Sequence, residues 1–395
     1  MKTLNYYLIN IMTIFRKRQL YCLCCLSLFI FCDVFSYSQW IKNPVICDYK
    51  IHDVSLMKGD DSTYYAFSTC NVARDSTTKI VYYGINIFRS VDLVNWKFWK
   101  RCTENTDSQS DNRTIMYMED GRVKFKEHNG SYAVWAPEVL QINGKILLFV
   151  SFRKNFDDSC IALYEADSIS SPFKYKTIVI SNNIQDRNYF NTREIIDPFP
   201  INVNGRLFLF FGSFARDKNG KFLNHRKGIG VYLVELDLND YSMKSKPIFI
   251  TDYYEGISVI NLNDEFFLFG TNGNWTDNTY SISYAHSKNI TGPYLNSKGL
   301  SISDTVKFNR GDIILQTNAY HKYGGFGCMS SPIIDKNGNY YVLANGHDKS
   351  IDPIVEKSSD KERYIFLLQL CWDSNSKPRF ILDNIINDKQ MIPDL

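Results

Sequence analysis

Three short motifs hold the strongest candidates for chemistry in this chain, because each places an acidic residue at a similar point of a repeated pattern. The motifs are HDVS around Asp53, IIDPFP around Asp197 and YYEGIS around Glu255. An aromatic run typical of a β-strand follows each of them. Carboxylates held in this way can converge on one axis, and converging carboxylates are what hydrolysis of a glycosidic bond requires.

Crowding would also give these carboxyl groups different protonation states. Like charges in one site raise the pKa of at least one carboxyl. A protonated acid and an ionised base are then present at the same pH, as general acid–base catalysis requires. One motif alone carries little weight among 42 acidic residues, so the phase of all three with the repeat is what indicates a site.

The motifs belong to a fivefold repeat of strands and turns. Its first element recurs near residues 53, 138, 197, 255 and 331 as HDVSLM, WAPEVLQI, IDPFPINV, EGISVINL and SSPIID. An apolar strand and then a third strand follow each copy. The spacing of about 58 to 85 residues suits a four-stranded blade with loops. The sequence therefore predicts an all-β, five-bladed β-propeller, whereas a β-sandwich would not explain five copies in one order.

Two of the spacings are longer, which predicts insertions around residues 101–132 and 296–325. Long loops on a propeller usually shape the mouth of its central pocket. No linker or second domain is evident. The propeller is therefore expected to cover residues 39–395 as one catalytic domain.

Residues 1–38 have the pattern of an export signal. Arg16, Lys17 and Arg18 precede the apolar stretch LYCLCCLSLFIFC, and SYSQ then offers a cleavage site before Gln39. The apolar stretch is short for a membrane span. A retained anchor is the alternative, and no stable membrane insertion is expected once the signal is removed. The pattern predicts a secreted, periplasmic or cell-surface protein.

The composition suits a large β-rich domain and argues against a nucleic-acid-binding class. Apolar residues make up 44% and aromatic residues 15% of the chain. The net charge is +3, and the basic residues form no block that would bind a polyanion. The cysteines beyond the N-terminal segment show no CxxC spacing, so the sequence indicates no metal site and no required cofactor.

The motifs IHDVSL, SVDLVNW, WAPEV, IIDPFP, YEGISV and SKNITGPY resemble those of glycoside hydrolase family 43, the five-bladed arabinanases, arabinofuranosidases and β-xylosidases. The resemblance runs from about Cys47 to about residue 380. It implies that Asp53 is the general base that activates water, that Asp197 orients the acid and tunes its pKa, and that Glu255 is the general acid. It also implies inversion of the anomeric configuration, for which a base–acid separation of roughly 6.5–9.5 Å is expected.

Five further residues are candidates for substrate binding. Trp135 is expected to stack on a sugar or close the pocket wall, and Phe199 to line the pocket. Glu138 either contacts substrate or packs within a blade. His52 either forms a hydrogen bond near the pocket floor or is structural. His347 either serves a polar role near the axis or is a structural histidine.

Two positions depart from the family pattern. Val54 stands where the family usually has proline, which shapes the strand end and does no chemistry. In the fifth blade, Cys328 in GGFGCMSS stands where many arabinanases carry a histidine that helps to hold a central ion. A structural calcium ion is therefore left open, and no metal-ligating residue is assigned.

The sequence thus predicts an exported, inverting glycoside hydrolase that acts on α-L-arabinofuranosyl or β-D-xylosyl linkages of plant cell-wall polysaccharides or oligosaccharides. One alternative is a retaining fructan- or sucrose-cleaving propeller, whose NDPNG, RDP and EC motifs are replaced here by HDVS, IDP and EG. The other is a catalytically inactive glycan-binding propeller. The altered fifth blade supports that reading, and the presence of all three acids argues against it.

Overall fold

Residues 41–395 form one compact unit built from strands and turns. The predicted export signal at 1–38 lies outside the residues that the structure describes, and no helix among the described residues is long and apolar enough to cross a membrane. This computed structural model describes residues 40–47, 51–71, 83–102, 114–119, 122–127, 133–155, 158–181, 194–214, 230–252, 254–274, 279–304, 311–318, 322–349, 363–381, 390–391, 393 and 395.

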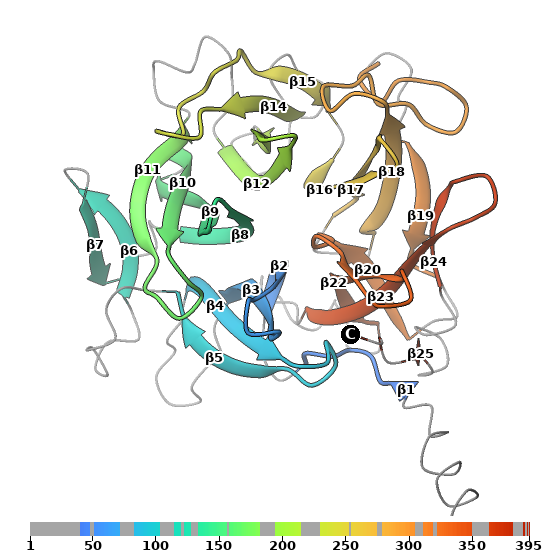
Figure 1. Ribbon diagram of the computed structural model, residues 1–395, viewed down its shortest axis with the longest axis horizontal. Helices are drawn as coiled ribbons and strands as arrows, with labels where there is room; N and C mark the ends of the chain where they lie inside the picture. Colours follow the sequence, from blue (N-terminus) through green and yellow to red (C-terminus); the bar gives the residue numbers. More distant parts are fainter. Residues whose placement is uncertain are drawn as a thin grey trace, which may run out of the picture. The chain divides into compact units, whose positions relative to one another are not determined.

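Five antiparallel sheets of neighbouring strands are arranged in a ring and form the blades of a β-propeller (Figure 1). The first two blades are β2 (Ile51–Lys58), β3 (Tyr64–Asn71), β4 (Tyr83–Ser90) and β5 (Lys97–Arg101), then β8 (Ala133–Ile142), β9 (Lys145–Asn155), β10 (Asp158–Ala166) and β11 (Lys174–Ser181). The third and fourth are β12 (Glu194–Val203), β13 (Arg206–Phe214), β14 (Gly230–Leu236) and β15 (Ile248–Thr251), then β16 (Glu255–Leu262), β17 (Glu265–Asn272), β18 (Ser281–Ser287) and β19 (Asp312–Gln316). The predicted fold class is confirmed.

The fifth blade has a divided inner strand. Both β20 (Tyr323–Gly327) and β21 (Ile333–Ile334) pair with β22 (Tyr340–Asp348), and β23 (Tyr364–Trp372) and β24 (Pro378–Phe380) complete the sheet. The motif SSPIID therefore supplies only the second half of this inner strand, and the preceding stretch YGGFG supplies the first half.

The two predicted insertions contain regular structure that the sequence pattern did not reveal. The first holds a hairpin of β6 (Thr114–Glu119) and β7 (Arg122–Glu127), and the second holds β19, the fourth strand of its blade. Two-residue strands β1 (Trp40–Ile41) and β25 (Gln390–Met391) lie outside the blades.

Tight turns join the first and second strands of several blades. Asn143-Gly144, Asn204-Gly205 and Asn263-Asp264 all adopt positive φ at both turn residues. The flanking residues pair directly, as Ile142 does with Lys145, so each loop has two residues. Asparagine, aspartate and glycine tolerate this conformation, and such turns match the twist of the strands that they connect. The turn residues therefore fix the pairing register of the inner strand.

The hydrophobic core lies between neighbouring blades. Five clusters of buried side chains each combine residues of two adjacent sheets, as where Leu147 and Phe149 of the second blade pack with Leu209 and Phe211 of the third. Burial of such side chains stabilises the ring by about 25 cal/mol per Å² of apolar surface.

The last blade packs against the first, which closes the ring. Leu343 and Leu367 of the fifth blade share a cluster with Ile51 and Leu56 of the first. The segment before β2 attaches to β23 as well, since the Asn43 side chain both donates to the Leu367 carbonyl and accepts from its N–H at 2.9 Å. These contacts hold the innermost strands around one axis.

Candidate active site

The innermost strands of the first four blades each carry one bulge at an equivalent position. Their pairing registers shift between His52 and Ser55, Trp135 and Glu138, Ile196 and Phe199, and Glu255 and Ser258. In the fifth blade, Cys328 takes the equivalent bulge position, because it follows Gly327, which pairs with Asn345 as His52 pairs with Thr69. The residue that is left-handed at each bulge is Asp53, Ala136, Asp197, Gly256 or Cys328, with φ between 46° and 55°. Non-glycine residues in this region are uncommon and cluster at functional sites.

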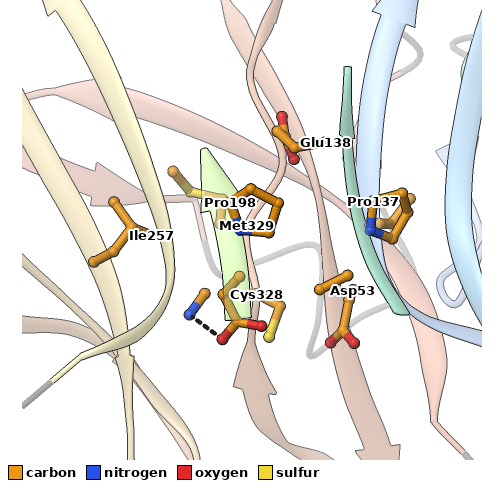
Figure 2. A pocket seen from close by; sticks show the side chains of 11 residues that line it. Asp53, Pro137, Glu138, Pro198, Ile257, Cys328 and Met329 are labelled. Atoms are coloured by element: carbon orange, nitrogen blue, oxygen red, sulfur yellow. Dashed lines mark hydrogen bonds between the residues drawn. The ribbon is translucent and has the colours of Figure 1, made fainter. Parts of the chain in front are cut away.

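All five bulge residues line one pocket, together with the residue that follows each of them (Figure 2). The pocket has an empty volume of about 350 Å³ and also includes Glu138 in its wall.

The bulges explain how two of the predicted acids converge. Asp53 and Asp197 occupy equivalent left-handed positions in the first and third blades. Glu255 lies one position before its bulge residue, Gly256, and so corresponds to His52 rather than to Asp53. The charges of Asp53, Asp197 and Glu255 all raise the pKa of the Cys328 thiol, so the three acids lie within electrostatic range of one residue.

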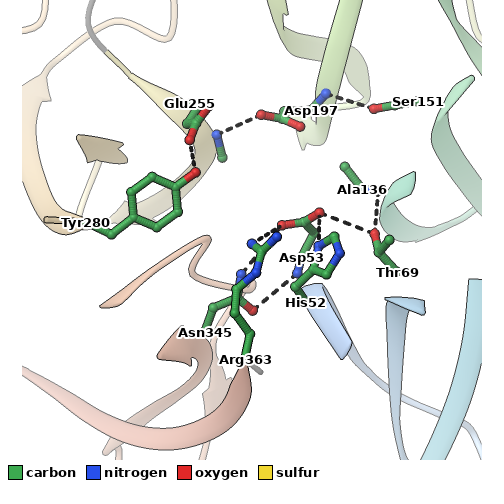
Figure 3. A network of polar contacts seen from close by, with 11 residues as sticks. His52, Asp53, Thr69, Ala136, Ser151, Asp197, Glu255, Tyr280, Asn345 and Arg363 are labelled. Carbon is green, nitrogen blue, oxygen red and sulfur yellow. Dashed lines mark hydrogen bonds and ion pairs between the residues drawn. The ribbon is translucent and has the colours of Figure 1, made fainter. Parts of the chain in front are cut away.

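Several donors surround the Asp53 carboxylate (Figure 3). His52 Nδ1 lies 2.6 Å from its Oδ2, to which Thr69 Oγ1 also donates at 3.3 Å. Asn345 Nδ2 donates to Oδ1 at 3.5 Å, and Arg363 Nη1 lies 3.7 Å from the same oxygen. Burial alone would raise the pKa of Asp53, but the charge and hydrogen bond of His52 and the charge of Arg363 outweigh it and hold the pKa well below its ordinary value. Asp53 is therefore ionised throughout the neutral range.

The Asp197 carboxylate has fewer donors. Its Oδ2 accepts the Gly256 N–H at 3.2 Å, and its backbone N–H donates to Ser151 Oγ at 2.9 Å. Burial, followed by the negative charge of Asp53, raises the pKa of Asp197 to about 7. Two carboxyls at equivalent positions thus differ in protonation over the mildly acidic range.

Glu255 begins β16 and is partly exposed beside this pair. The Tyr280 hydroxyl donates a hydrogen bond to its Oε1 (Figure 3). Tyr280 is itself buried, with 3% of its surface exposed, so its ring orients the Glu255 side chain from behind.

Glu138 lies in the pocket wall, and its Oε1 has no hydrogen-bond partner among the described residues. Burial raises its pKa to about 8, against the opposing effect of hydrogen bonds with Ser55 and Ser331. The carboxyl is therefore neutral at pH 7, which is how a carboxyl without a cationic partner is accommodated in a buried position.

The remaining predicted binding residues lie at different depths. Trp135 is partly exposed and adjoins the bulge residue Ala136. Phe199 does not line the pocket: it is 2% exposed and packs in the core between the third and fourth blades, since its side chain points away from the axis after the bulge. His347 is 4% exposed on β22 and pairs with Gly324, outside the pocket lining.

Sequence reasoning missed four residues of the site, Thr69, Tyr280, Asn345 and Arg363. A polar residue inside an otherwise apolar second strand, as in YYAFST and YVLAN, is the signal that could have found Thr69 and Asn345. Arg363 stands 310 positions from Asp53 in no motif of the repeat, and Tyr280 has no such signal either.

The described residues near the axis include no cluster typical of a calcium site. Calcium prefers several charged or carbonyl oxygens, and no group of three or more His, Cys, Asp or Glu side chains among the described residues is placed to hold a metal. At the fifth bulge, burial followed by the neighbouring carboxylates raises the pKa of the Cys328 thiol well above its ordinary value, so the thiol stays neutral.

Comparisons with known proteins agree with this geometry. Residues 41–378 match the family described as Glycosyl hydrolases family 43. The chain is 24% identical over 356 residues to the extracellular exo-α-(1→5)-L-arabinofuranosidase ArbA of Cellvibrio japonicus, covering 83% of this chain and 86% of that protein. It is 26% identical over 265 residues to the extracellular endo-α-(1→5)-L-arabinanase 1 of Bacillus subtilis, covering 64% of this chain and 69% of that protein.

Solved structures share the fold. An exo-1,5-α-L-arabinanase from a bovine ruminal metagenomic library superposes with a TM-score of 0.60 at 20% identity, covering 85% of this chain and 98% of that chain. A xylan β-1,4-xylosidase from Bacillus halodurans C-125 superposes with a TM-score of 0.63 at 17% identity, covering 90% of this chain and 59% of that chain.

Proposed function

Since the chain belongs to glycosyl hydrolases family 43 and is therefore a glycosidase, we propose that it is an exported, inverting enzyme that cleaves α-L-arabinofuranosyl linkages of plant cell-wall polysaccharide. The curated relatives that it resembles are named for activity on α-(1→5)-L-arabinan, which favours arabinofuranosyl over β-D-xylosyl substrates. One observation carries the mechanism: two carboxyls at equivalent bulges of one pocket have opposite pKa shifts, with Glu255 beside them.

Asp53 is the general base. Its low pKa keeps the carboxylate ionised, so that it takes a proton from a water molecule as that water attacks the anomeric carbon. His52, Thr69 and Arg363 hold the carboxylate in place during this step. The water oxygen forms the new bond on the face of the sugar opposite the leaving group, which inverts the configuration.

Glu255 is the general acid and protonates the departing glycosidic oxygen as the bond to the anomeric carbon breaks. Tyr280 aims its carboxyl through the hydrogen bond to Oε1. Asp197 holds the backbone next to Glu255 through the Gly256 N–H, and its charge, when present, favours the protonated form of the acid. No covalent intermediate and no cofactor is needed, so treatment with a chelator is expected to leave activity intact.

Hydrolysis of a small panel of substrates tests this proposal. The panel comprises linear arabinan, aryl α-L-arabinofuranoside, xylan and aryl β-D-xyloside, with the anomer of the first product read by NMR. Turnover of the arabinose substrates with an inverted product supports the proposal. A retained product contradicts the mechanism, turnover of the xylose substrates alone contradicts the sugar, and no turnover by folded protein contradicts both in favour of a glycan-binding propeller.

Export is part of the proposal. It rests on the signal pattern in residues 1–38 and on the description of the relatives as extracellular. Cell fractionation with N-terminal sequencing of the exported protein tests it, and a mature chain that begins at Gln39 is the expected result. Retention of the full-length chain inside the cell would contradict it.

A further inference from the structure

An incomplete ring of hydrogen bonds links neighbouring blades at the level of the bulges. In four blades, one residue of the second strand pairs with the inner-strand residue just before the bulge, and its side chain accepts the N–H of the bulge residue in the following blade. Figure 3 shows the bonds of Thr69, Ser151 and Asn345. The four such bonds are Thr69 with Ala136 at 2.7 Å, Ser151 with Asp197 at 2.9 Å, Thr271 with Cys328 at 2.8 Å and Asn345 with Asp53 at 3.2 Å.

The third blade breaks this ring. Its residue at the acceptor position is Gly212, which pairs with Ile196 as Thr69 pairs with His52. Gly212 is buried and has no side chain to offer. The N–H of the next bulge residue, Gly256, donates instead to Oδ2 of Asp197.

Comparison with the first blade shows what a hydroxyl at position 212 would do. The Thr69 hydroxyl accepts the N–H of the next blade and donates to its own blade's bulge carboxylate, Asp53. The Asp53 carboxylate is thereby separated from the backbone of the following blade by one side chain. Asp197 has no such intermediary and contacts that backbone directly, at the residue that follows Glu255.

We propose, building on the proposed function, that Gly212 is a positioning residue for the reaction: by withholding the acceptor that the other four blades supply, it makes Asp197 bind the Gly256 N–H directly. This contact fixes the Asp197 carboxylate beside the backbone that carries the general acid. Gly256 is half-buried, and a hydroxyl at position 212 would offer its N–H a second acceptor, as Thr69 does for Ala136, and so compete with Asp197. Gly256 adopts φ 55°, and a Cβ there would lie 2.9 Å from Cys328 Sγ, so only glycine fits this position.

The first test follows the Gly256 amide in full-length protein by NMR with selective glycine labelling, which does not depend on any hydrolytic activity. If its N–H is bonded to the Asp197 carboxyl, its chemical shift should titrate with an apparent pKa of about 7 in the wild type. The step should disappear in Asp197→Asn. A Gly256 amide that shows no step in the wild type, or one that keeps its step in Asp197→Asn, overturns the proposal.

The second test compares Gly212→Ser with Gly212→Ala, which place the same Cβ in the same space and differ only in the hydroxyl. The serine variant should lose the Gly256 titration step and roughly tenfold in kcat, with little change in KM, as expected for an interaction that acts on the transition state. The alanine variant should keep the step and most of kcat. Equal behaviour of the two folded variants overturns the proposal, and if the serine variant does not fold, the wild-type and Asp197→Asn titrations decide it. If Gly212→Ser loses the Gly256 titration step but the wild-type protein hydrolyses none of the substrates, the result counts against the proposed function and not against the role of Gly212 in positioning Asp197.

Discussion

Asp53 and Asp197 occupy the same bulge position two blades apart, with φ of 50° and 55°, yet their pKa values move in opposite directions. Asp53 has a cation and several donors around it and stays ionised. Asp197 is buried, accepts the Gly256 N–H and has the charge of Asp53 nearby, and so keeps its proton up to about pH 7. The repeated backbone sets where a carboxyl lies, and the side chains of neighbouring strands set what it can do.

Removing the general base or the general acid should have the largest effect on activity. Asp53→Asn and Glu255→Gln should each lower kcat by roughly a thousandfold or more, because each removes one of the two proton transfers. Steady-state kinetics with an aryl glycoside and a thermal melt of each variant provide the measurement.

Asp264→Asn is a suitable control for these two variants. Asp264 is an exposed turn residue at φ 59°, a conformation that asparagine also adopts. It should retain full activity. Near-wild-type kcat in folded Asp53→Asn or Glu255→Gln would refute their assigned roles.

Replacing the second bulge carboxyl has a smaller expected effect. At pH values above about 7, where Asp197 is ionised, Asp197→Asn should lower kcat by roughly a hundredfold, since an amide cannot carry the charge that keeps the acid protonated. The alkaline limb of the kcat/KM profile should move to lower pH for the same reason. A pH profile from 4 to 9 measures both, and an unmoved limb would show that Asp197 does not tune Glu255.

Removing His52 should make Asp53 resemble Asp197 more closely. His52→Ala deletes the charge and the hydrogen bond that oppose the effect of burial, so the pKa of Asp53 should rise. Stability that the ionised Asp53 contributes is present above its unfolded pKa of about 4 and is lost as pH falls below it, so the variant should have a smaller loss on acidification. We expect roughly a tenfold decrease in kcat.

Urea unfolding at pH 3 and pH 6 measures the change in acid sensitivity. His286→Ala is the matched control, because His286 also contacts a carboxylate, Glu265, but lies outside the pocket. If His52→Ala and His286→Ala show the same loss of stability between pH 6 and pH 3 and the same kcat, His52 does not control the pKa of the general base Asp53.

Glu138 provides the mildest test, since burial raises the pKa of its carboxyl as it raises that of Asp197. Its pKa rises from an ordinary 4.5 to about 8, so the folded state keeps a proton that the unfolded state releases between these values. Wild-type stability should therefore decrease as pH rises through that window. Glu138→Gln removes this loss and should be the more stable protein by about 4 kcal/mol at pH 8 relative to the difference at pH 4.

Glu265→Gln provides the reference for this measurement, because the pKa of Glu265 is lowered and its pH dependence falls at more acidic values. Unfolding free energies of the three proteins at pH 4 and pH 8 are compared. If the difference in unfolding free energy between Glu138→Gln and the wild type does not change with pH, Glu138 is ionised in the folded protein.

Local patterns made much of the fold predictable. Five copies of one strand order and turn residues such as Asn143-Gly144 and Asn204-Gly205 act over a few neighbouring residues, and the structure bears them out. The inner strand of the fifth blade was harder to predict, because its two short pieces are joined only through pairing with β22. The core position of Phe199 was also hard to predict from local sequence, since it depends on the bulge that precedes it.

The repeat in the amino-acid sequence was sufficient to predict five blades and the motifs that carry Asp53, Asp197 and Glu255. The ionisation of these carboxyls depends on tertiary contacts, because Arg363 and Asn345 reach Asp53 from the other end of the chain. The proposed role of Gly212 also depends on tertiary structure, since Gly212 offers no side-chain acceptor to the Gly256 N–H of the next blade and Asp197 binds that N–H instead. Hydrogen bonds and charge interactions depend on distance in space and on burial, and no repeat spacing records either of them.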